Sequence, residues 1–173
     1  MKTSKHSEWY TPEHYIDAAR EVMGDIDLDP ASCVLAQETV RAGVFYTKED
    51  DGLALPWFGR VWLNPPYGQL GPMFVAKAVT AYRAGDVEAA ILMLNGYSYQ
   101  TRWFQPLFDY AICWHTGRVD YHTPLAGTGG SAHGTAIVYL GKDVSRFVDE
   151  FGRFGPVTGR LGRTDWERVM YGV

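Results

Sequence analysis

The stretch Val61-Trp62-Leu63-Asn64-Pro65-Pro66-Tyr67-Gly68 begins as a short apolar run and ends abruptly in an amide, two prolines and an aromatic ring. Proline fixes φ, lacks a backbone N–H donor and keeps the preceding residue out of the helical region. Asn64 should therefore lie rigidly at the carboxyl end of a strand. In open α/β sheets, ligands bind beyond the carboxyl ends of the strands, so this stretch predicts both a fold and a site.

The groups that follow this strand suit a planar amine. The side chain of Asn64 and the carbonyl of Pro65 offer oxygen acceptors, and Tyr67 offers a flat surface beside them. An ordinary proline-rich loop, with Tyr67 as a packing residue, is the alternative interpretation. Other motifs in the chain decide between a site for an amine and an ordinary loop.

A second strand end carries a carboxylate. Ile26-Asp27-Leu28-Asp29-Pro30 alternates like a short strand and then turns, which places Asp29 at a carboxyl end. A carboxylate there can attract a positively charged ligand or accept hydrogen bonds from a ribose. A plain turn is the alternative, because Asp-Pro commonly starts turns. Cys33 is interpreted as a small buried thiol rather than a reactive one.

The remaining periodic segments predict a layered α/β fold. The expected helices cover residues 12–23, 70–84 and 142–150, and further strands are expected over residues 89–94, 111–114 and 135–140. Thr11 is the expected N-cap of the first helix. Residues 34–48 are too short for a full strand-helix-strand unit. We expect a β-hairpin to tie Val119–Tyr121 to the strand at 135–140.

Length and composition favour one packed domain over residues 1–173. The chain has 46% hydrophobic residues and no run long enough to cross a membrane, so we expect no membrane association. Its N-terminus lacks an apolar signal region, and its two cysteines form no framework, which favours a reducing cytoplasm. The net charge of −4 argues against non-specific nucleic-acid binding, although the arginine-rich C-terminal part leaves room for a local DNA-facing surface.

Asn64-Pro65-Pro66-Tyr67 resembles the (D/N/S)PP(Y/F/W) motif of amino methyltransferases, which use S-adenosylmethionine to methylate exocyclic amines. Its context resembles, in order and spacing, the phage-type DNA N-6-adenine methyltransferase (Dam) family. The matching blocks are Trp9-Tyr10-Thr11-Pro12, Asp27 to Ser32, Asp51-Gly52-Leu53 with Trp57, and Asn64 to Tyr67, with a weaker match at Gly117-Arg118-Val119.

This resemblance implies a compact Rossmann-like methyltransferase fold, with a mostly parallel sheet and a terminal antiparallel hairpin. It implies methyl transfer from S-adenosylmethionine to N6 of an adenine flipped out of duplex DNA, in the cytoplasm of a bacterial or phage-infected host cell. The implied catalytic residues are Asn64, Pro65, Pro66 and Tyr67. The implied cofactor-binding residues are Trp9, Tyr10, Thr11, Pro12, Asp29, Pro30, Ala31, Ser32, Asp51, Gly52, Leu53 and Asn64.

The chain departs from larger methyltransferases near the cofactor. Asp29-Pro30-Ala31-Ser32 replaces their usual glycine-rich loop, as it does in the family that the chain resembles. The acidic residue that would hold the ribose is also displaced; Glu49, Asp50 and Asp51 are the candidates. Asp51 best matches the family's Asp-Gly-Leu, which implies a place near the adenine of the cofactor, whereas a solvated acidic turn is preferred for the other two.

DNA contacts are expected from loops at the carboxyl edge of the sheet, because the chain has no room for a separate recognition domain. The segments 97–104 and 117–134 offer the candidates Tyr97, Arg102, Arg118, Ser131 and His133. Aromatic and guanidinium planes can stack on bases. Trp103 and Phe104 could instead pack inward, and Arg118 could pair with a carboxylate and serve stability alone.

Other functions use similar groups. Methylation of cytosine N4, of RNA or of a protein glutamine could rely on the same Asn-Pro-Pro-Tyr, and the resemblance alone favours adenine in DNA. A non-catalytic remnant that binds DNA or cofactor is the alternative from another class. A metal-dependent nuclease fits poorly, because the carboxylates cluster before the catalytic strand, and the five histidines lack metal-ligand spacing, so we expect no metal.

Overall fold

The computed structural model describes residues 10–123, 127–130 and 134–159. Its main sheet has seven strands in the order β2-β1-β3-β4-β8-β5-β9. These strands are β1 (Leu28–Asp29), β2 (Val44–Phe45), β3 (Gly59–Leu63), β4 (Val87–Asn95), β5 (Ala111–Trp114), β8 (Thr135–Leu140) and β9 (Val157–Thr158).

Most of these strands run in one direction. β2, β1, β3 and β4 pair in parallel. β8 pairs antiparallel with both β4 and β5, so it is inserted between two strands that share a direction, and β9 pairs antiparallel with β5. The predicted Rossmann-like, mostly parallel sheet is thereby confirmed, and its two antiparallel strands, β8 and β9, lie on either side of β5.

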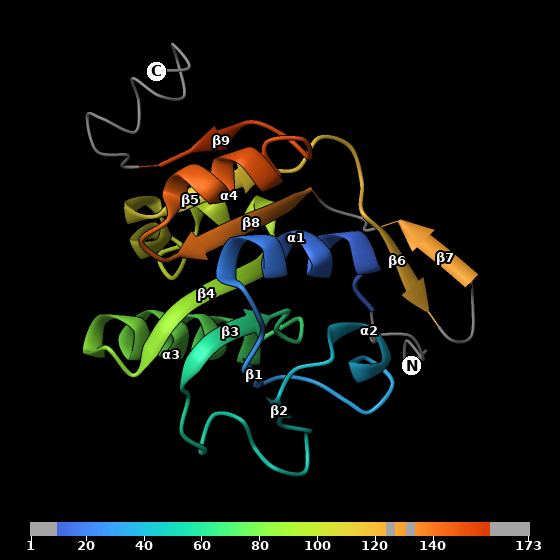
Figure 1. Ribbon diagram of the computed structural model, residues 1–173, viewed down its shortest axis with the longest axis vertical. Coiled ribbons are helices and arrows are strands. Elements are labelled where there is room, and N and C mark those ends of the chain that lie inside the picture. Colours follow the sequence, from blue (N-terminus) through green and yellow to red (C-terminus); the bar gives the residue numbers. More distant parts are fainter. Residues whose placement is uncertain (1–9, 124–126, 131–133, 160–173) are drawn as a thin grey trace.

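Helices cover both faces of the sheet (Figure 1). α1 (Glu13–Met23) and α4 (Val144–Phe151) lie on one face, and α3 (Leu70–Ala84) lies on the other. Successive strand residues enter opposite cores: Trp62 and Ile91 pack with α1 and α4, whereas Leu63 and Leu92 pack with α3. Each of these buried side chains contributes roughly 1.5–3 kcal/mol through burial. The apolar runs are therefore strands covered on both faces.

The chain between β1 and β3 is shorter than a regular α/β unit but retains its form. The four-residue helix α2 (Gln37–Val40) connects the two-residue strands β1 and β2, which pair in parallel. As predicted, residues 34–48 do not hold a full strand-helix-strand unit: they contain only α2 and β2, and β1, which precedes them, completes the unit. The strand ending at Asp29 was predicted from its alternation, whereas the two residues of β2 carry too short a pattern to be recognised.

Two other local predictions also fail. The expected hairpin partner is wrong: β6 (Asp120–Thr123) pairs with β7 (Gly127–Gly130) in a separate two-stranded sheet, not with β8. Thr11 is not the N-cap of α1, because Pro12 takes that position with an extended ψ of 144° and no side-chain cap bond. The α1 end is as predicted, at Met23 with Gly24 following.

The segment between β4 and β5 contains two short 3-10 helices, η1 (Gly96–Gln100) and η2 (Gln105–Asp109). Phe104 and Leu107 from this segment are fully buried in the core beside α3. Inward packing therefore accounts for Phe104, while Tyr97 and Tyr99 of η1 stay exposed. Among the described residues, every helix is too short or too polar to span a membrane.

Candidate active site

Three polar side chains meet at the carboxyl edge of the sheet. Asp29 ends β1, Asn64 directly follows β3, and Asn95 ends β4. β1 and β4 are the two neighbours of β3, and all three strands run in parallel. The sheet therefore brings a carboxylate and two amides, separated in the sequence, to one edge.

A cavity of about 450 Å³ opens at this edge. Cavities of roughly 300–1,000 Å³ typically hold small molecules of drug or cofactor size. Its walls include the residues Tyr10, Thr11, Asp29, Pro30, Ala31, Ser32, Cys33, Lys48, Asp51, Gly52, Leu53, Asn64, Pro65, Pro66, Tyr67, Leu70 and Phe74. Three blocks of the sequence that were predicted to bind a cofactor thus line one space together with the Asn-Pro-Pro-Tyr turn.

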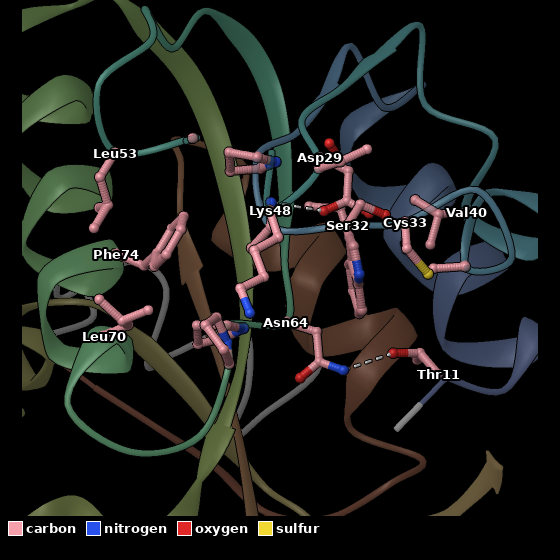
Figure 2. A pocket seen from close by; sticks show the side chains of 18 of the residues that line it. Thr11, Asp29, Ser32, Cys33, Val40, Lys48, Leu53, Asn64, Leu70 and Phe74 are labelled. Atoms are coloured by element: carbon pink, nitrogen blue, oxygen red, sulfur yellow. Dashed lines mark hydrogen bonds between the residues drawn. The ribbon is translucent and has the colours of Figure 1, made fainter. Parts of the chain in front are cut away.

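The amide of Asn64 has a defined orientation in this cavity. Its Nδ2 donates to Oγ1 of Thr11 at 3.3 Å. Figure 2 shows this bond and shows the Asn64 oxygen pointing away from Thr11. Thr11 is therefore not a helix cap but a hydrogen-bond acceptor for Asn64, and it helps to keep the acceptor oxygen of Asn64 pointing away from Thr11.

Asp29 is a buried carboxylate, with 3% of its surface exposed. Nε2 of Gln37 donates to its Oδ2 at 2.8 Å and to Oγ of Ser32 at 2.8 Å, while the Ala31 backbone N–H lies 3.4 Å from Oδ1. Burial raises the pKa of Asp29 to about 6, and the hydrogen bonds from Ser32, Ala31 and Gln37 offset part of that effect. Among the described residues Asp29 forms no ion pair, so its carboxylate can attract a positively charged ligand or accept hydrogen bonds from one.

The loop that carries Asp51, Gly52 and Leu53 is held in place by hydrogen bonds that other side chains donate to its carbonyl groups. Nζ of Lys77 on α3 donates to the carbonyl oxygens of Gly52, Leu53 and Leu55, and Nε1 of Trp57 donates to that of Gly52 at 2.8 Å. A Cβ atom at position 52 would lie 2.0 Å from the carbonyl oxygen of Pro30. Glycine is therefore required where this loop meets the Asp29 loop.

The two sides of the cavity differ in chemistry, as Figure 2 shows. Leu53, Leu70 and Phe74 form an apolar side, and Asp29 with Ser32 lies opposite. The side chain of Lys48 extends between them with its ammonium group directed toward Asn64. One side suits a flat apolar ring, and the other suits polar and cationic groups.

A second cavity, of about 190 Å³, lies next to the first and shares its Asn64 to Tyr67 wall. Its other lining comes from the start of α3, the end of β4 and the segment after it, namely Gly68, Gly71, Pro72, Val75, Met93, Leu94, Asn95, Ser98 and Trp103. The Asn-Pro-Pro-Tyr turn therefore separates a larger space from a smaller one, and its side chains can reach ligands in both.

The remaining predicted site residues take different places. Trp9, Ser131 and His133 lie outside the described residues. Pro12 is buried and absent from the lining of either cavity. Tyr97, Arg102 and Arg118 are exposed outside both cavities. The alternative role predicted for Arg118 was a stabilising ion pair with a carboxylate. Arg118 makes no ion pair with any of the residues that the structure describes.

Sequence reasoning missed several residues of the cavity. Gln37, which holds both Asp29 and Ser32, and Lys77, which holds the 52–55 carbonyls, act from helices whose patterns signal packing only. Lys48 lines the cavity, while its neighbours Glu49 and Asp50 are exposed outside it, as preferred from the sequence. Cys33 is half-buried and lines the cavity rather than the core, with Sγ 3.7 Å from the hydroxyl of Tyr10. Across the described residues, no group of three His, Cys, Asp or Glu side chains is placed to hold a metal ion.

The parallel sheet with its inserted antiparallel β8, and the cavity at its carboxyl edge, define the class of Rossmann-like α/β proteins with a ligand site at the strand ends. The family of the chain is more specific than this class. The chain belongs to the DNA N-6-adenine-methyltransferase (Dam) family, whose sequence profile matches residues 1–138. It is thus an adenine-specific DNA methyltransferase, and DNA is its substrate.

Similarity to individual known proteins is weaker. The solved structures that are similar include a dimethyladenosine transferase from Plasmodium falciparum, which is 11% identical and has a TM-score of 0.44. The similarity covers 84% of this chain and 67% of that one. No curated protein matches the chain.

Proposed function

We propose that the chain binds S-adenosylmethionine in the larger cavity and a flipped-out adenine in the smaller one, and that Asn64, Pro65, Pro66 and Tyr67 form the catalytic turn between them. The observation that carries this proposal is that both cavities share the wall from Asn64 to Tyr67. A methyl donor and an acceptor amine held on either side of one rigid turn are close enough to react.

The larger cavity fits S-adenosylmethionine in chemistry as well as size. Leu53, Leu70 and Phe74 would hold the adenine ring, and the buried carboxylate of Asp29 would attract the positive charge or accept hydrogen bonds from the ribose. Tyr10, Thr11 and Ser32 would contact the remaining polar groups. When bound, S-adenosylmethionine would supply an activated methyl group to N6, with the sulfur leaving as a neutral thioether and the N6 proton passing to water.

The residues of the turn act on the amine. The exocyclic nitrogen of adenine is a weak nucleophile, because its lone pair is delocalised into the ring. Oδ1 of Asn64 and the carbonyl of Pro65 would accept its two hydrogens and favour a pyramidal nitrogen. Tyr67 would stack on the base, and Pro66 would keep the turn rigid, so the chain contributes positioning and electrostatics.

DNA recognition is assigned to loops within the same domain. Tyr97, Arg102 and Arg118 are exposed, as groups that contact DNA must be. Because N6 is paired in duplex DNA, the target base must leave the helix to reach the smaller cavity. The sugar and phosphate groups would then stay at the surface, within reach of these side chains.

The test is methylation of duplex DNA by the purified chain with labelled S-adenosylmethionine, followed by digestion and separation of the methylated nucleosides. We expect N6-methyladenine from the wild type and a loss of roughly a hundredfold or more in single-turnover rate for Asn64→Ala, with cofactor affinity retained. Gln69→Ala, an exposed amide outside both cavities, is the matched control. Label in N4-methylcytosine, or near-normal turnover by Asn64→Ala, would contradict the proposal.

A further inference from the structure

The smaller cavity contains a second amide besides Asn64. Asn95 ends β4, the strand that pairs in parallel with β3, and it lines the same cavity as the Asn-Pro-Pro-Tyr turn. The rest of that lining combines apolar and aromatic residues, including Met93, Leu94 and Trp103, with exposed polar atoms. A polar group among such neighbours is well placed to choose between ligands of similar shape.

The orientation of the Asn95 amide is set by the chain itself. Its Oδ1 caps η1 by accepting a hydrogen bond from the backbone N–H of Tyr97 at 3.0 Å. Turning the amide over would place its NH₂ group against that N–H, so the oxygen stays on the η1 side. Within the part of the chain that the structure describes, Nδ2 of Asn95 donates to no protein acceptor. The group offered to a ligand is therefore a hydrogen-bond donor.

The kinds of groups that these lining residues carry match one edge of adenine. Asn64 and the Pro65 carbonyl present acceptors, which suit the hydrogens of N6, and Asn95 presents a donor. The ring atom next to the amine on the Watson–Crick edge is N1, which is an acceptor. A flipped base keeps its sugar outside the protein and therefore enters with this edge foremost.

We infer that Asn95 is a specificity residue, and that its Nδ2 donates a hydrogen bond to N1 of the target adenine. This inference rests on the proposed function of the two cavities. Guanine carries a hydrogen on N1. Its N1–H would face the Nδ2 donor of Asn95 with no acceptor between them, so guanine is rejected. Cytosine presents the same pair of an amine and a ring acceptor, so Asn95 selects amino bases over oxo bases and leaves the choice between adenine and cytosine to the shape of the cavity.

The test combines a variant with a single-atom change in the DNA. Asn95→Asp keeps an oxygen to cap Tyr97 but replaces the donor by an acceptor, so η1 keeps its N-cap. Single-turnover methylation is measured on duplexes with adenine, 1-deazaadenine or 7-deazaadenine at the target position. Because 1-deazaadenine also changes the reactivity of the amine, the informative quantity is the ratio of the adenine rate to the 1-deazaadenine rate, compared between wild type and variant.

We expect this ratio to be roughly tenfold higher for the wild type than for Asn95→Asp, as one neutral hydrogen bond would give. The 7-deazaadenine ratio should be the same for both proteins, and Ser98→Ala, which changes the same cavity wall, should keep the wild-type 1-deazaadenine ratio. Equal 1-deazaadenine ratios in wild type and Asn95→Asp, or a difference seen only with 7-deazaadenine, would overturn the inference. Failure of the wild type to methylate ordinary adenine would instead refute the proposed function.

Discussion

Replacement of the buried carboxylate by an amide, Asp29→Asn, should move stability and cofactor affinity in opposite directions. The pKa of Asp29 is raised from 3.8 to about 6 because the group is buried. At neutral pH the folded protein therefore holds a charge that the unfolded chain solvates better. The difference between these pKa values corresponds to about 3 kcal/mol of lost folding stability.

The sign follows from the direction of the shift. Since the folded state binds the proton more tightly, the contribution of Asp29 to stability is fully present below pH 3.8, falls between pH 3.8 and about 6, and is lost above that. The amide of the variant would carry no charge at any pH. The variant would lose about 1 kcal/mol because an NH₂ group cannot accept the hydrogen bonds that the carboxylate of Asp29 accepts. Above pH 6 the free energy of unfolding of Asp29→Asn should therefore exceed that of the wild type by about 2 kcal/mol.

Chemical denaturation at pH 5 and pH 8 measures this gain, with Asp17→Asn on the exposed side of α1 as the control. Calorimetry with S-adenosylmethionine and with its demethylated product measures affinity on the same proteins. We expect Asp29→Asn to weaken binding roughly tenfold to a hundredfold, as loss of a charged hydrogen-bond partner does. Wild-type affinity should also rise between pH 5 and pH 7, while that of the variant should not.

Two results would refute this reasoning. If Asp29→Asn is no more stable than the wild type at pH 8, the buried charge does not oppose folding. If its cofactor affinity is unchanged, Asp29 is a turn residue without a ligand. If Asp29→Asn loses the same affinity for S-adenosylmethionine and for its product, Asp29 contacts the ribose or the ammonium group, which both ligands carry. If it loses more affinity for S-adenosylmethionine, Asp29 contacts the sulfonium.

Three further outcomes follow from contacts in the site. Lys77→Met should raise the KM for S-adenosylmethionine about tenfold with little change in kcat, because the 52–55 loop loses its ammonium donor while α3 keeps its packing; steady-state kinetics check this. Gly52→Ala should lower stability by about 1–3 kcal/mol in urea denaturation, since its Cβ would overlap the Pro30 carbonyl. Arg118→Ala should weaken DNA binding in a salt-dependent way while cofactor affinity and Tm stay normal; a lower Tm with normal DNA binding would give this side chain a structural role instead.

The parts of the site that the sequence predicted are those with strong local chemistry. Two consecutive prolines fix the backbone whatever surrounds them, so Asn64 could be placed at a strand end without any tertiary information. Asp29 could be placed by the same argument from Pro30. The apolar run of β4 is long enough to be recognised as a buried strand, and the end of α1 is marked by a glycine.

The missed parts depend on contacts between distant segments. Lys77 has the pattern of a polar residue on an amphipathic helix, and only the folded chain brings it to the 52–55 carbonyls. Gln37 acts on Asp29 in the same way. The partner of β6 was missed because glycine-rich β7 has no hydrophobic alternation that would identify it as a strand.

Helix α3 serves as a common wall for both cavities. Leu70 and Phe74 face the larger cavity, whereas Gly71 and Val75, each one position further along, line the smaller one. The spacing between the two cavities is therefore set within a single helical turn. Such an arrangement has little modularity, because a shift of α3 as a whole would move one wall of each cavity. Changes confined to the smaller cavity can instead arise in β4, in η1 and at Trp103, which line that cavity and not the larger one.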